Sequence, residues 1–592
     1  MKIMKNIMKG LGVIWSCALL SVSCSEISFG DDFLGNQPES SGATTEEMFS
    51  SQINAEKVLV KAYSGLPYGL PTSSDNKLGG NILESLTDLC QSFRDNVSDA
   101  PMKLYYNGAL SANNCPTNSA YKFGSKSDWT TIRYAWLYLE NVDKVPDMSV
   151  SEKEQRKAEA KMLIALSYFE MLRYVGGVPY IDHYIDVNET MSFPRMTFAQ
   201  TVENIVSLLD EVILTSALPW KQDDVNDGRM TKAGAMALKF KVLQWAASPA
   251  FNSDVKWHSD ADEYTCYGNY DVQRWKDAAN AGKAFFDAVA QNGQYELIKA
   301  SESTHRAYRL AYRQAYYNRG GSEVLISTRK GYDVSTHSTY IDQRYYTGPT
   351  LNYVDMFPWE DGSEFDGENF NWSNPEKQPF FTKNDMVPTR DPRLYENVAC
   401  PGDIYCTGTT APVYINHANY KNGSGFLIMK YILQEASDRN SPVHWSHTRL
   451  AEIMLGYAEV LNEVSNGPTS EAYSLVNEVR ARVGLCDLPK NLSKTAFAEA
   501  VLKERALELG FEEVRWFDLV RRDRKSDFTK TLYGLRSKGN DLNNPTAFTF
   551  EKVELENKRY WATTPFDTKW YLQPIPQDEI NKQYGMTQNP GW

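Results

Sequence analysis

Hydrophobic residues recur three and four positions apart along most of the chain, which is the spacing of one buried face of an α-helix. Patterns of this kind predict helices at about 198–214, 231–247, 273–290, 447–464, 470–483 and 495–509. Gly510 stands where the last of these helices is expected to end. Another helix is predicted by the apolar residues Trp129, Ile132, Trp136 and Leu139. The sequence therefore predicts a mainly α protein.

Two of the predicted helices begin with a capping-box pattern, in which a Ser or Thr is followed three residues later by Glu. Thr44 and Glu47 form one such pair, and Ser151 and Glu154 form the other. On several helices small Ala residues alternate with large aromatic ones, which lets neighbouring helices interlock. This pattern is similar to tetratricopeptide units. Because their strict period of about 34 residues is missing, we expect paired helices and not a regular solenoid.

Long stretches with weak periodicity and many Gly, Asn, Pro and Tyr residues interrupt the helices at 66–126, 300–348 and 350–446. Loops this long inside a compact protein usually carry function. We therefore expect one domain, residues 44–592, in which loop-rich insertions extend from a helical scaffold. The scaffold is predicted at about 44–300 and 447–592, and the insertions at about 66–126 and 300–446.

The first residues have the pattern of a secretion signal. Three lysines precede an apolar run, Leu11 to Val22, that is shorter than the roughly 20 residues of a membrane-spanning helix. The segment resembles a bacterial lipoprotein signal, residues 1–23, after which Cys24 carries acyl chains. Residues 24–43 would then form a lipidated tether. The alternative is simple cleavage that leaves Cys24 as an ordinary residue.

Composition narrows the class of protein. Hydrophobic residues make up 42% and charged residues 23% of the chain, as in ordinary folded proteins. The net charge of −13 argues against binding to nucleic acid, which requires a basic face. No CxxC motif occurs, which argues against zinc and dithiol redox chemistry, and no cofactor is expected. Cys400 and Cys406 flank a turn-forming Pro-Gly pair and could form a disulfide, although free, mostly buried thiols are favoured.

Motifs of common catalytic and metal sites are missing or incomplete. The sequence has no GxSxG, GxxxxGK or HExxH motif. His444 and His447 have helical spacing, but no nearby acidic residue completes a metal site, so a surface or capping role is predicted. The segment from Asp223 to Gly228 resembles a calcium loop but lacks ligands at required positions. It is better interpreted as a turn that leads to Thr231, the N-cap of the next helix.

Three glutamates near the C-terminus, Glu504, Glu508 and Glu512, fall four residues apart on one helical face. A glycosidase would need two carboxylates across a cleft, one of them with a raised pKa. Arginine neighbours lower carboxylate pKa values instead. The arginines expected to pair with these glutamates are Arg505, Arg515 and Arg521. We therefore favour structural ion pairs over catalysis, and we also expect the core to contain Trp516 and Phe517.

Two C-terminal segments carry a family resemblance. They are Lys503 to Arg521, with the sequence KERALELGFEEVRWFDLVR, and Tyr571 to Pro576, YLQPIP, followed by the terminal TQNPGW. Further matching segments, in the expected order, are Asp32 to Leu34, Arg173 to Tyr180, Gly228 to Lys232, Asp391 to Leu394, Arg449 to Glu463 and Asn477 to Gly484. Together they resemble the SusD/RagB family, the surface glycan-binding lipoproteins of Bacteroidetes-type bacteria. The final Trp592 departs from the Tyr that is common in this family.

The resemblance implies a lipid-anchored protein that faces outward from the cell outer membrane. Such a protein is not an enzyme: it captures a glycan and delivers it to a SusC-like TonB-dependent transporter. The resemblance also places the glycan site on variable loops in the two tyrosine-rich portions of the chain. Aromatic rings stack on sugars, and amides and arginines bind hydroxyls. The candidate ligand contacts are Arg94, Tyr105, Tyr106, Asn107, Tyr345 and Tyr346.

Two alternatives stay open. The first is a peptide-binding member of the same family or a peptide-binding helical scaffold, because a shared fold does not fix the ligand. The second is a cell-surface glycoside hydrolase, which the missing catalytic set disfavours.

Overall fold

A computed structural model describes most of the chain after residue 43. The described residues are 44–70, 78, 81–93, 100–115, 121–186, 188–189, 192–329, 347–374, 376–405, 409–411, 423–432, 444–556 and 559–592. They are mainly α-helical, with short strands in two-stranded sheets, which confirms the predicted fold class. The expected signal, tether and domain boundaries stay predictions. Predicted functional residues that lie outside the described residues are Cys24, Arg94, Tyr345, Tyr346 and Cys406.

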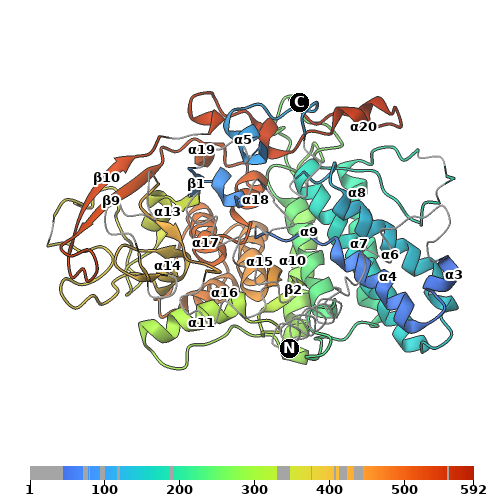
Figure 1. Cartoon of the computed structure of the whole chain (residues 1–592), viewed down its shortest axis with the longest axis horizontal. Coiled ribbons are helices and arrows are strands. Elements are labelled where there is room, and N and C mark those ends of the chain that lie inside the picture. The colour runs from blue at the N-terminus through green and yellow to red at the C-terminus, as the bar shows by residue number, and fades with distance from the viewer. Residues whose placement is uncertain are drawn as a thin grey trace, which may run out of the picture.

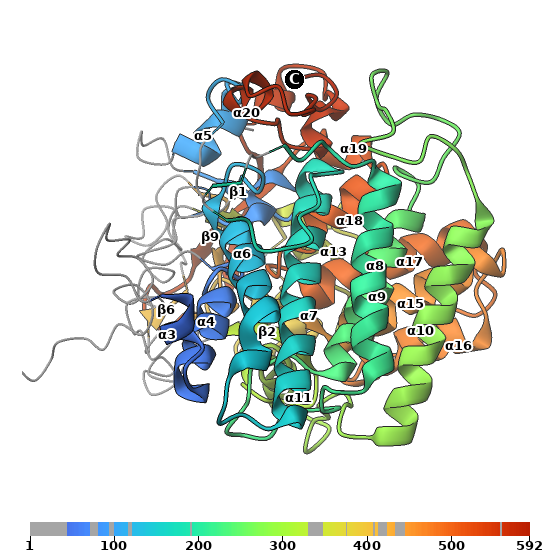
Figure 2. The same ribbon diagram turned by 90° about the vertical axis from the view of Figure 1, so that its right-hand side faces the viewer.

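The scaffold is a row of helices that lie side by side (Figure 2). In chain order they are α4 (Gln52–Ser64), α6 (Lys126–Asn141), α7 (Val150–Val175), α8 (Phe198–Thr215), α9 (Lys232–Ala247), α10 (Val272–Asn292), α15 (Leu450–Val464), α16 (Ser470–Ala481) and α17 (Lys494–Leu509). From α4 to α10 each helix packs on the next in this order, and α15 packs on α10, α16 and α17. This arrangement agrees with the predicted pairing of helices.

Three details of the helix boundaries differ from the prediction. The capping box of α7 is formed by Ser149 and Glu152, two residues before the predicted pair. The box at Thr44 begins the short helix α3 (Thr45–Met48), while α4 has its own N-cap at Ser51. Helix α15 begins at Leu450, because the preceding residues form a strand.

The loop-rich part includes α13 (Leu351–Met356) and α14 (Pro392–Asn397), which lie with β9 (Tyr533–Gly539) and β10 (Phe548–Glu554) at the left of Figure 1, beside the scaffold. The strands form antiparallel pairs: β1 (Cys90–Ser92) with β3 (Thr347–Pro349), β2 (Val324–Arg329) with β8 (His444–Arg449), β4 (Val398–Ala399) with β7 (Leu427–Ile428), β5 (Ile404–Tyr405) with β6 (Thr409–Thr410), and β9 with β10. The remaining α-helices are α5 (Ala100–Tyr106), α11 (His305–Tyr317), α18 (Arg515–Arg521), α19 (Lys525–Phe528) and α20 (Gln577–Asn581).

Helix α11 corrects the prediction of a loop at 300–348. Tyr312 and Tyr316 are four residues apart on its buried face, so this tyrosine-rich segment packs as a helix. Both rings belong to an aromatic core beneath the loop-rich part, which is separate from the core between the scaffold helices. The tyrosines at these two positions therefore stabilise the fold.

The C-terminal turn binds the end of α7. Gly176 ends this helix with a φ of 78°, and a Cβ atom there would lie 2.7 Å from the carbonyl oxygen of Tyr264. The buried Asn589 side chain donates hydrogen bonds to the carbonyl oxygens of Val175 at 3.0 Å and Gln573 at 2.6 Å. Its own oxygen accepts a hydrogen bond from Arg195 at 2.5 Å. These hydrogen bonds join α7 to segments that lie hundreds of residues away in the sequence.

We expect Asn589→Ala to lower the free energy of unfolding by about 1–3 kcal/mol for each buried partner that loses its hydrogen bond. Urea denaturation measures this loss. Asn581→Ala is the control, because Asn581 is exposed and its side chain accepts a hydrogen bond from Gln577 on the same short helix. Equal stability of the two variants would contradict this account of the C-terminal turn.

Candidate functional site

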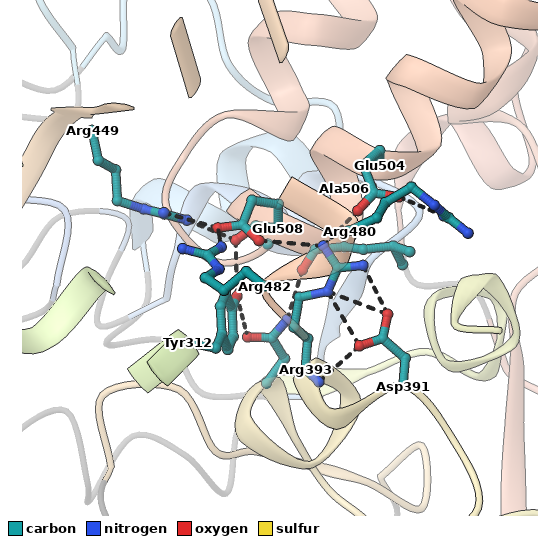
Figure 3. Close-up of polar contacts among 12 residues, drawn as sticks. Tyr312, Asp391, Arg393, Arg449, Arg480, Arg482, Glu504, Ala506 and Glu508 are labelled. Atoms are coloured by element: carbon teal, nitrogen blue, oxygen red, sulfur yellow. Dashed lines mark hydrogen bonds and ion pairs between the residues drawn. The ribbon is translucent and has the colours of Figure 1, made fainter. Parts of the chain in front are cut away.

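The glutamates considered for catalysis lie in a buried cluster of ion pairs (Figure 3). On α17, Glu504 binds Arg393 at 2.6 Å and Arg480 at 3.0 Å. One turn later, Glu508 binds Arg393 at 3.2 Å, Arg449 at 2.9 Å and also Arg482. The side chains of both glutamates are at most 2% exposed. Neither carboxylate therefore faces a cleft that could hold a substrate.

The surroundings of Glu508 shift its pKa in the direction opposite to the one that a general acid needs. Burial opposes ionisation of this carboxyl group, but Arg482, Arg449 and Arg393 together hold its pKa well below the ordinary value. A glycosidase acid needs a raised pKa so that it carries a proton at neutral pH. The geometry confirms the predicted structural role of the glutamates.

The partners of these glutamates differ from the predicted ones. Arg505 binds Asp518 at 2.7 Å, Arg515 binds Asp88 at 2.7 Å, and Arg521 binds Glu459 at 2.6 Å. Glu512 lies beyond the end of α17, where it binds Arg449 at 2.7 Å and Lys430 at 2.6 Å. The arginines that neutralise the glutamates come from remote segments, which local spacing does not reveal.

The other residues considered for chemistry have structural positions. His444 and His447 lie on strand β8, and neither has the surface or helix-capping role predicted for it. The His444 ring is buried and donates a hydrogen bond to the carbonyl oxygen of Tyr316, while His447 contacts the Thr328 hydroxyl. Within the described part of the chain, no group of three metal-ligating side chains comes together. Thr231 is the N-cap of α9, as predicted.

The predicted core residues and thiols agree with the structure where it describes them. Trp516 and Phe517 are each 4% exposed, which confirms their place in the core. Cys400 is a buried free thiol. Cys90, Cys266 and Cys486 are also free thiols.

The described candidate ligand contacts lie on and just after α5, and not in a loop as predicted. The ring of Tyr105 is 5% exposed and stacks on Tyr121 at 6.2 Å between ring centroids. The hydroxyl of Tyr106 donates a hydrogen bond to the carbonyl oxygen of Ser85 at 2.7 Å. Asn107 is exposed, and its side-chain oxygen accepts a hydrogen bond from the amide of Ala109 at 3.0 Å. Their part in ligand binding stays a prediction.

An open cavity of about 1000 Å³ lies near the same end of the molecule. Figures 1 and 2 both place α5, α20 and the C-terminus at this end. The cavity is lined by residues within 123–133, which contains the start of α6, by Pro179, Ile181 and Phe193, and by residues within 579–584, which contains the end of α20. Its volume is at the upper end of the range for small-molecule sites, which is about 300–1000 Å³.

One face of α6 forms a wall of this cavity. Lys126, Trp129, Thr130 and Arg133 line it, and their spacing of three, four and seven residues from the first places them on one side of the helix. The opposite side of α6 is buried in the scaffold core through residues such as Ile132. Trp129, which the sequence pattern places on the apolar face, is half-buried: it packs against the scaffold core and also lines the cavity.

The side chains of this wall are held in place. The Trp129 indole donates a hydrogen bond to the carbonyl oxygen of Phe123 at 2.9 Å, and the two rings meet edge to face at 5.7 Å between centroids. Arg133 donates to the carbonyl oxygen of Ile185 at 2.8 Å and to the hydroxyl of Tyr184 at 2.7 Å. Both groups are therefore oriented before any ligand arrives.

The C-terminal segment forms the opposite edge of the cavity. Glu579 pairs with Lys582 at 2.8 Å and accepts a hydrogen bond from the Tyr584 hydroxyl at 2.9 Å. Burial and this hydrogen bond raise the pKa of Tyr584, so its phenol stays protonated. Pro179, Ile181 and Phe193 supply apolar surface between the two edges. The site thus combines aromatic and apolar surface with a few polar groups, as ligand sites do.

Comparison with known proteins identifies the family. A model of the SusD family matches residues 327–592, and a model described as "Starch-binding associating with outer membrane" matches residues 32–243. The chain belongs to the SusD/RagB family, and the description of one of its two matching models indicates glycan binding and association with the outer membrane. The motifs in its sequence therefore identified the family correctly.

Relatives agree with this assignment. A SusD-like protein of Formosa agariphila is 37% identical over 90 residues, which are 14% of this chain and 18% of that protein. A second SusD-like protein of the same organism is 23% identical over 427 residues, which are 68% of this chain and 73% of that protein. The chain thus spans less than a fifth of the first relative and nearly three quarters of the second.

Solved structures share the fold. A SusD-like protein from Bacteroides fragilis has a TM-score of 0.69 and 22% identity, with 92% of this chain and 98% of that chain covered. A laminarin-binding SusD-like protein has a TM-score of 0.58 and 19% identity, with 92% and 100% covered. In the described residues, none of the helices has both the length and the apolar character needed to cross a bilayer.

We expect Glu508→Gln to lower the free energy of unfolding by about 3–5 kcal/mol, because it leaves buried arginines without their carboxylate. Glu499→Gln on the same helix is the control. Its carboxylate is exposed and pairs with Arg524 at the surface, so the expected loss is at most about 1 kcal/mol. Urea denaturation compares the two variants, and a similar small loss in both would show that the buried cluster does not stabilise the fold.

Proposed function

We propose that this protein is a cell-surface lipoprotein that captures a glycan, leaves it uncut and delivers it to a SusC-like TonB-dependent transporter of the outer membrane. The observation that carries the proposal is the ordered match of the two SusD family models along the chain. The description of one model as starch-binding supports a glycan ligand. So does a solved relative that is described as laminarin-binding.

The arrangement of the candidate carboxylates supports binding without catalysis. Glu504 and Glu508, the pair best placed by sequence to act as acid and base, are both occupied by arginines. A captured glycan would therefore pass to the transporter intact. The affinity for the glycan is expected to be modest, because a weaker complex dissociates faster and can release the glycan to the transporter.

The proposed anchor is a set of acyl chains on Cys24. One acyl chain holds a protein only marginally at a membrane, since each buried methylene contributes about 0.8 kcal/mol, but several chains together hold it firmly. Residues 24–43 would then join the anchor to the folded part. This arrangement keeps the binding protein on the outer face of the membrane, beside its proposed transporter.

We expect the purified protein to bind at least one polysaccharide of a panel and to leave its chain length unchanged. Affinity electrophoresis or calorimetry measures binding, and a reducing-end assay of the same mixtures measures cleavage. New reducing ends that disappear in a folded Glu504→Gln variant would overturn the proposal. Failure to bind any glycan, together with binding of peptides, would favour the peptide-binding alternative.

We expect Cys24→Ala to leave a folded protein that no longer sediments with the outer-membrane fraction, because it lacks the acylated cysteine. Immunoblots of fractionated cells follow its location. Cys115→Ala is the control, since it removes a half-buried thiol within the folded part and leaves the anchor intact. Retention of Cys24→Ala on membranes after a high-salt wash contradicts the lipid anchor.

A further inference from the structure

We propose that the cavity between α6 and α20 binds a uronic-acid-containing oligosaccharide, with Trp129 as the stacking surface and Lys126 and Arg133 as the partners of its carboxylate. This inference rests on the proposed function and names the class of glycan. None of the three residues is among the ligand contacts that the sequence suggested. The argument depends on their placement, their orientation and the charge of the site.

The first step is the composition of the exposed face of α6. A helix that only covers a core has polar residues on its outer face, where long charged side chains extend into water. Here a tryptophan stands between two cations, and all three side chains line an open volume of about 1000 Å³. The ring of Trp129 packs partly against the scaffold core, and its half-buried placement leaves the rest of the ring open to a ligand.

The second step is preorganisation. The hydrogen bond from the Trp129 indole to Phe123, at 2.9 Å, fixes the plane of the ring. The guanidinium of Arg133 lies 4.5 Å from the centroid of the Tyr184 ring and donates hydrogen bonds to Ile185 and Tyr184. A guanidinium has five N–H donors. Donors therefore remain for a carboxylate, and the group that presents them loses little freedom on binding.

The third step is charge. The lining contains three cations and one carboxylate, and that carboxylate, Glu579, is paired with Lys582. Lys126 and Arg133 therefore give the cavity a positive character on a chain whose net charge is −13. The nearby carboxylates Asp182 and Glu189 both bind His183 and do not line the cavity. The local sign is complementary to an anionic ligand and opposite to that of the whole protein.

The fourth step is the chemistry of the ligand. The planar fork of an arginine matches a carboxylate through two parallel hydrogen bonds. Trp129 and Phe193 offer flat apolar surface, which suits the C–H face of a sugar ring. The phenol of Tyr584 and the hydroxyl of Thr130 can bind sugar hydroxyls. A sugar that carries a carboxylate uses all of these groups at once.

The test measures binding of polygalacturonate and alginate oligosaccharides by calorimetry, with laminarin as a neutral probe and carrageenan as a sulfated probe. We expect the wild-type protein to bind a uronate probe. Trp129→Ala and Lys126→Glu should each weaken this binding at least about tenfold, the scale of losing one anchor contact. Lys126 is exposed, so its variant tests the site even where the tryptophan variant fails to fold.

Matched controls separate local effects from loss of structure. Trp220 is also half-buried, and its indole also donates to a backbone carbonyl at 2.9 Å, but it lies outside the cavity. Trp220→Ala and Lys283→Ala should therefore keep wild-type affinity. Arg133→Lys, which retains charge but loses the planar fork, should weaken uronate binding as well.

The outcomes distinguish this inference from the proposed function. Binding of a neutral or sulfated glycan alone overturns the inference and leaves the proposed function intact. The same holds for a uronate probe that binds folded Trp129→Ala and Lys126→Glu as tightly as the wild type. If the protein binds no glycan of any class, the proposed function fails, and this inference fails with it.

Discussion

The buried ion-pair cluster around Glu508 is the interaction on which the rest of the structure depends. It gathers side chains from both parts of the molecule: Arg393 from α14 in the loop-rich part, Arg449 from the end of β8, Arg482 just after α16, and Glu323 just before β2. Removing so many charges from water is costly unless each one meets an opposite partner. Several segments must therefore be in their correct places at the same time, and this requirement fixes the loop-rich part onto the helical row.

Because of this constraint, the residues that stabilise the fold differ from those that line the proposed ligand site. Much of the family signature near the C-terminus forms ion pairs, and the terminal turn with Asn589 secures α7. Residues of this kind stabilise the fold whatever the ligand is. The ligand site can then vary without loss of the fold, because it lies on surfaces that the cluster holds in place but does not include. The cavity beside Trp129 is such a surface.

The sequence predicted the structural elements that depend on residues close together in the chain. The periodicity of α8, α9 and α17 was sufficient to find these helices, and the ordered motifs were sufficient to find the family. Strand β8 was missed because it is set by pairing with β2, more than a hundred residues away in sequence. Helix α11 was missed because its buried face is made of Ala and Tyr, which resembled an aromatic loop.

The candidate site was less predictable for a related reason. Tyr105 looked available for a ligand, but Tyr121 and Trp570 pack against its ring from other parts of the chain. The wall of the cavity did have a local signal, since Lys126, Trp129 and Arg133 share one helical face. That signal was hidden because a tryptophan at helical spacing is usually a core residue. Only the tertiary arrangement shows that this face borders an open volume.

Hydrogen–deuterium exchange with and without bound glycan tests the central claim most directly, because it maps the site without changing a residue. The account predicts that a bound uronate oligosaccharide slows exchange in segments 123–133, 179–193 and 579–584. It also predicts no change in α17, whose amides are already protected within the core. Slower exchange confined to other segments, with these three unchanged, would contradict the account.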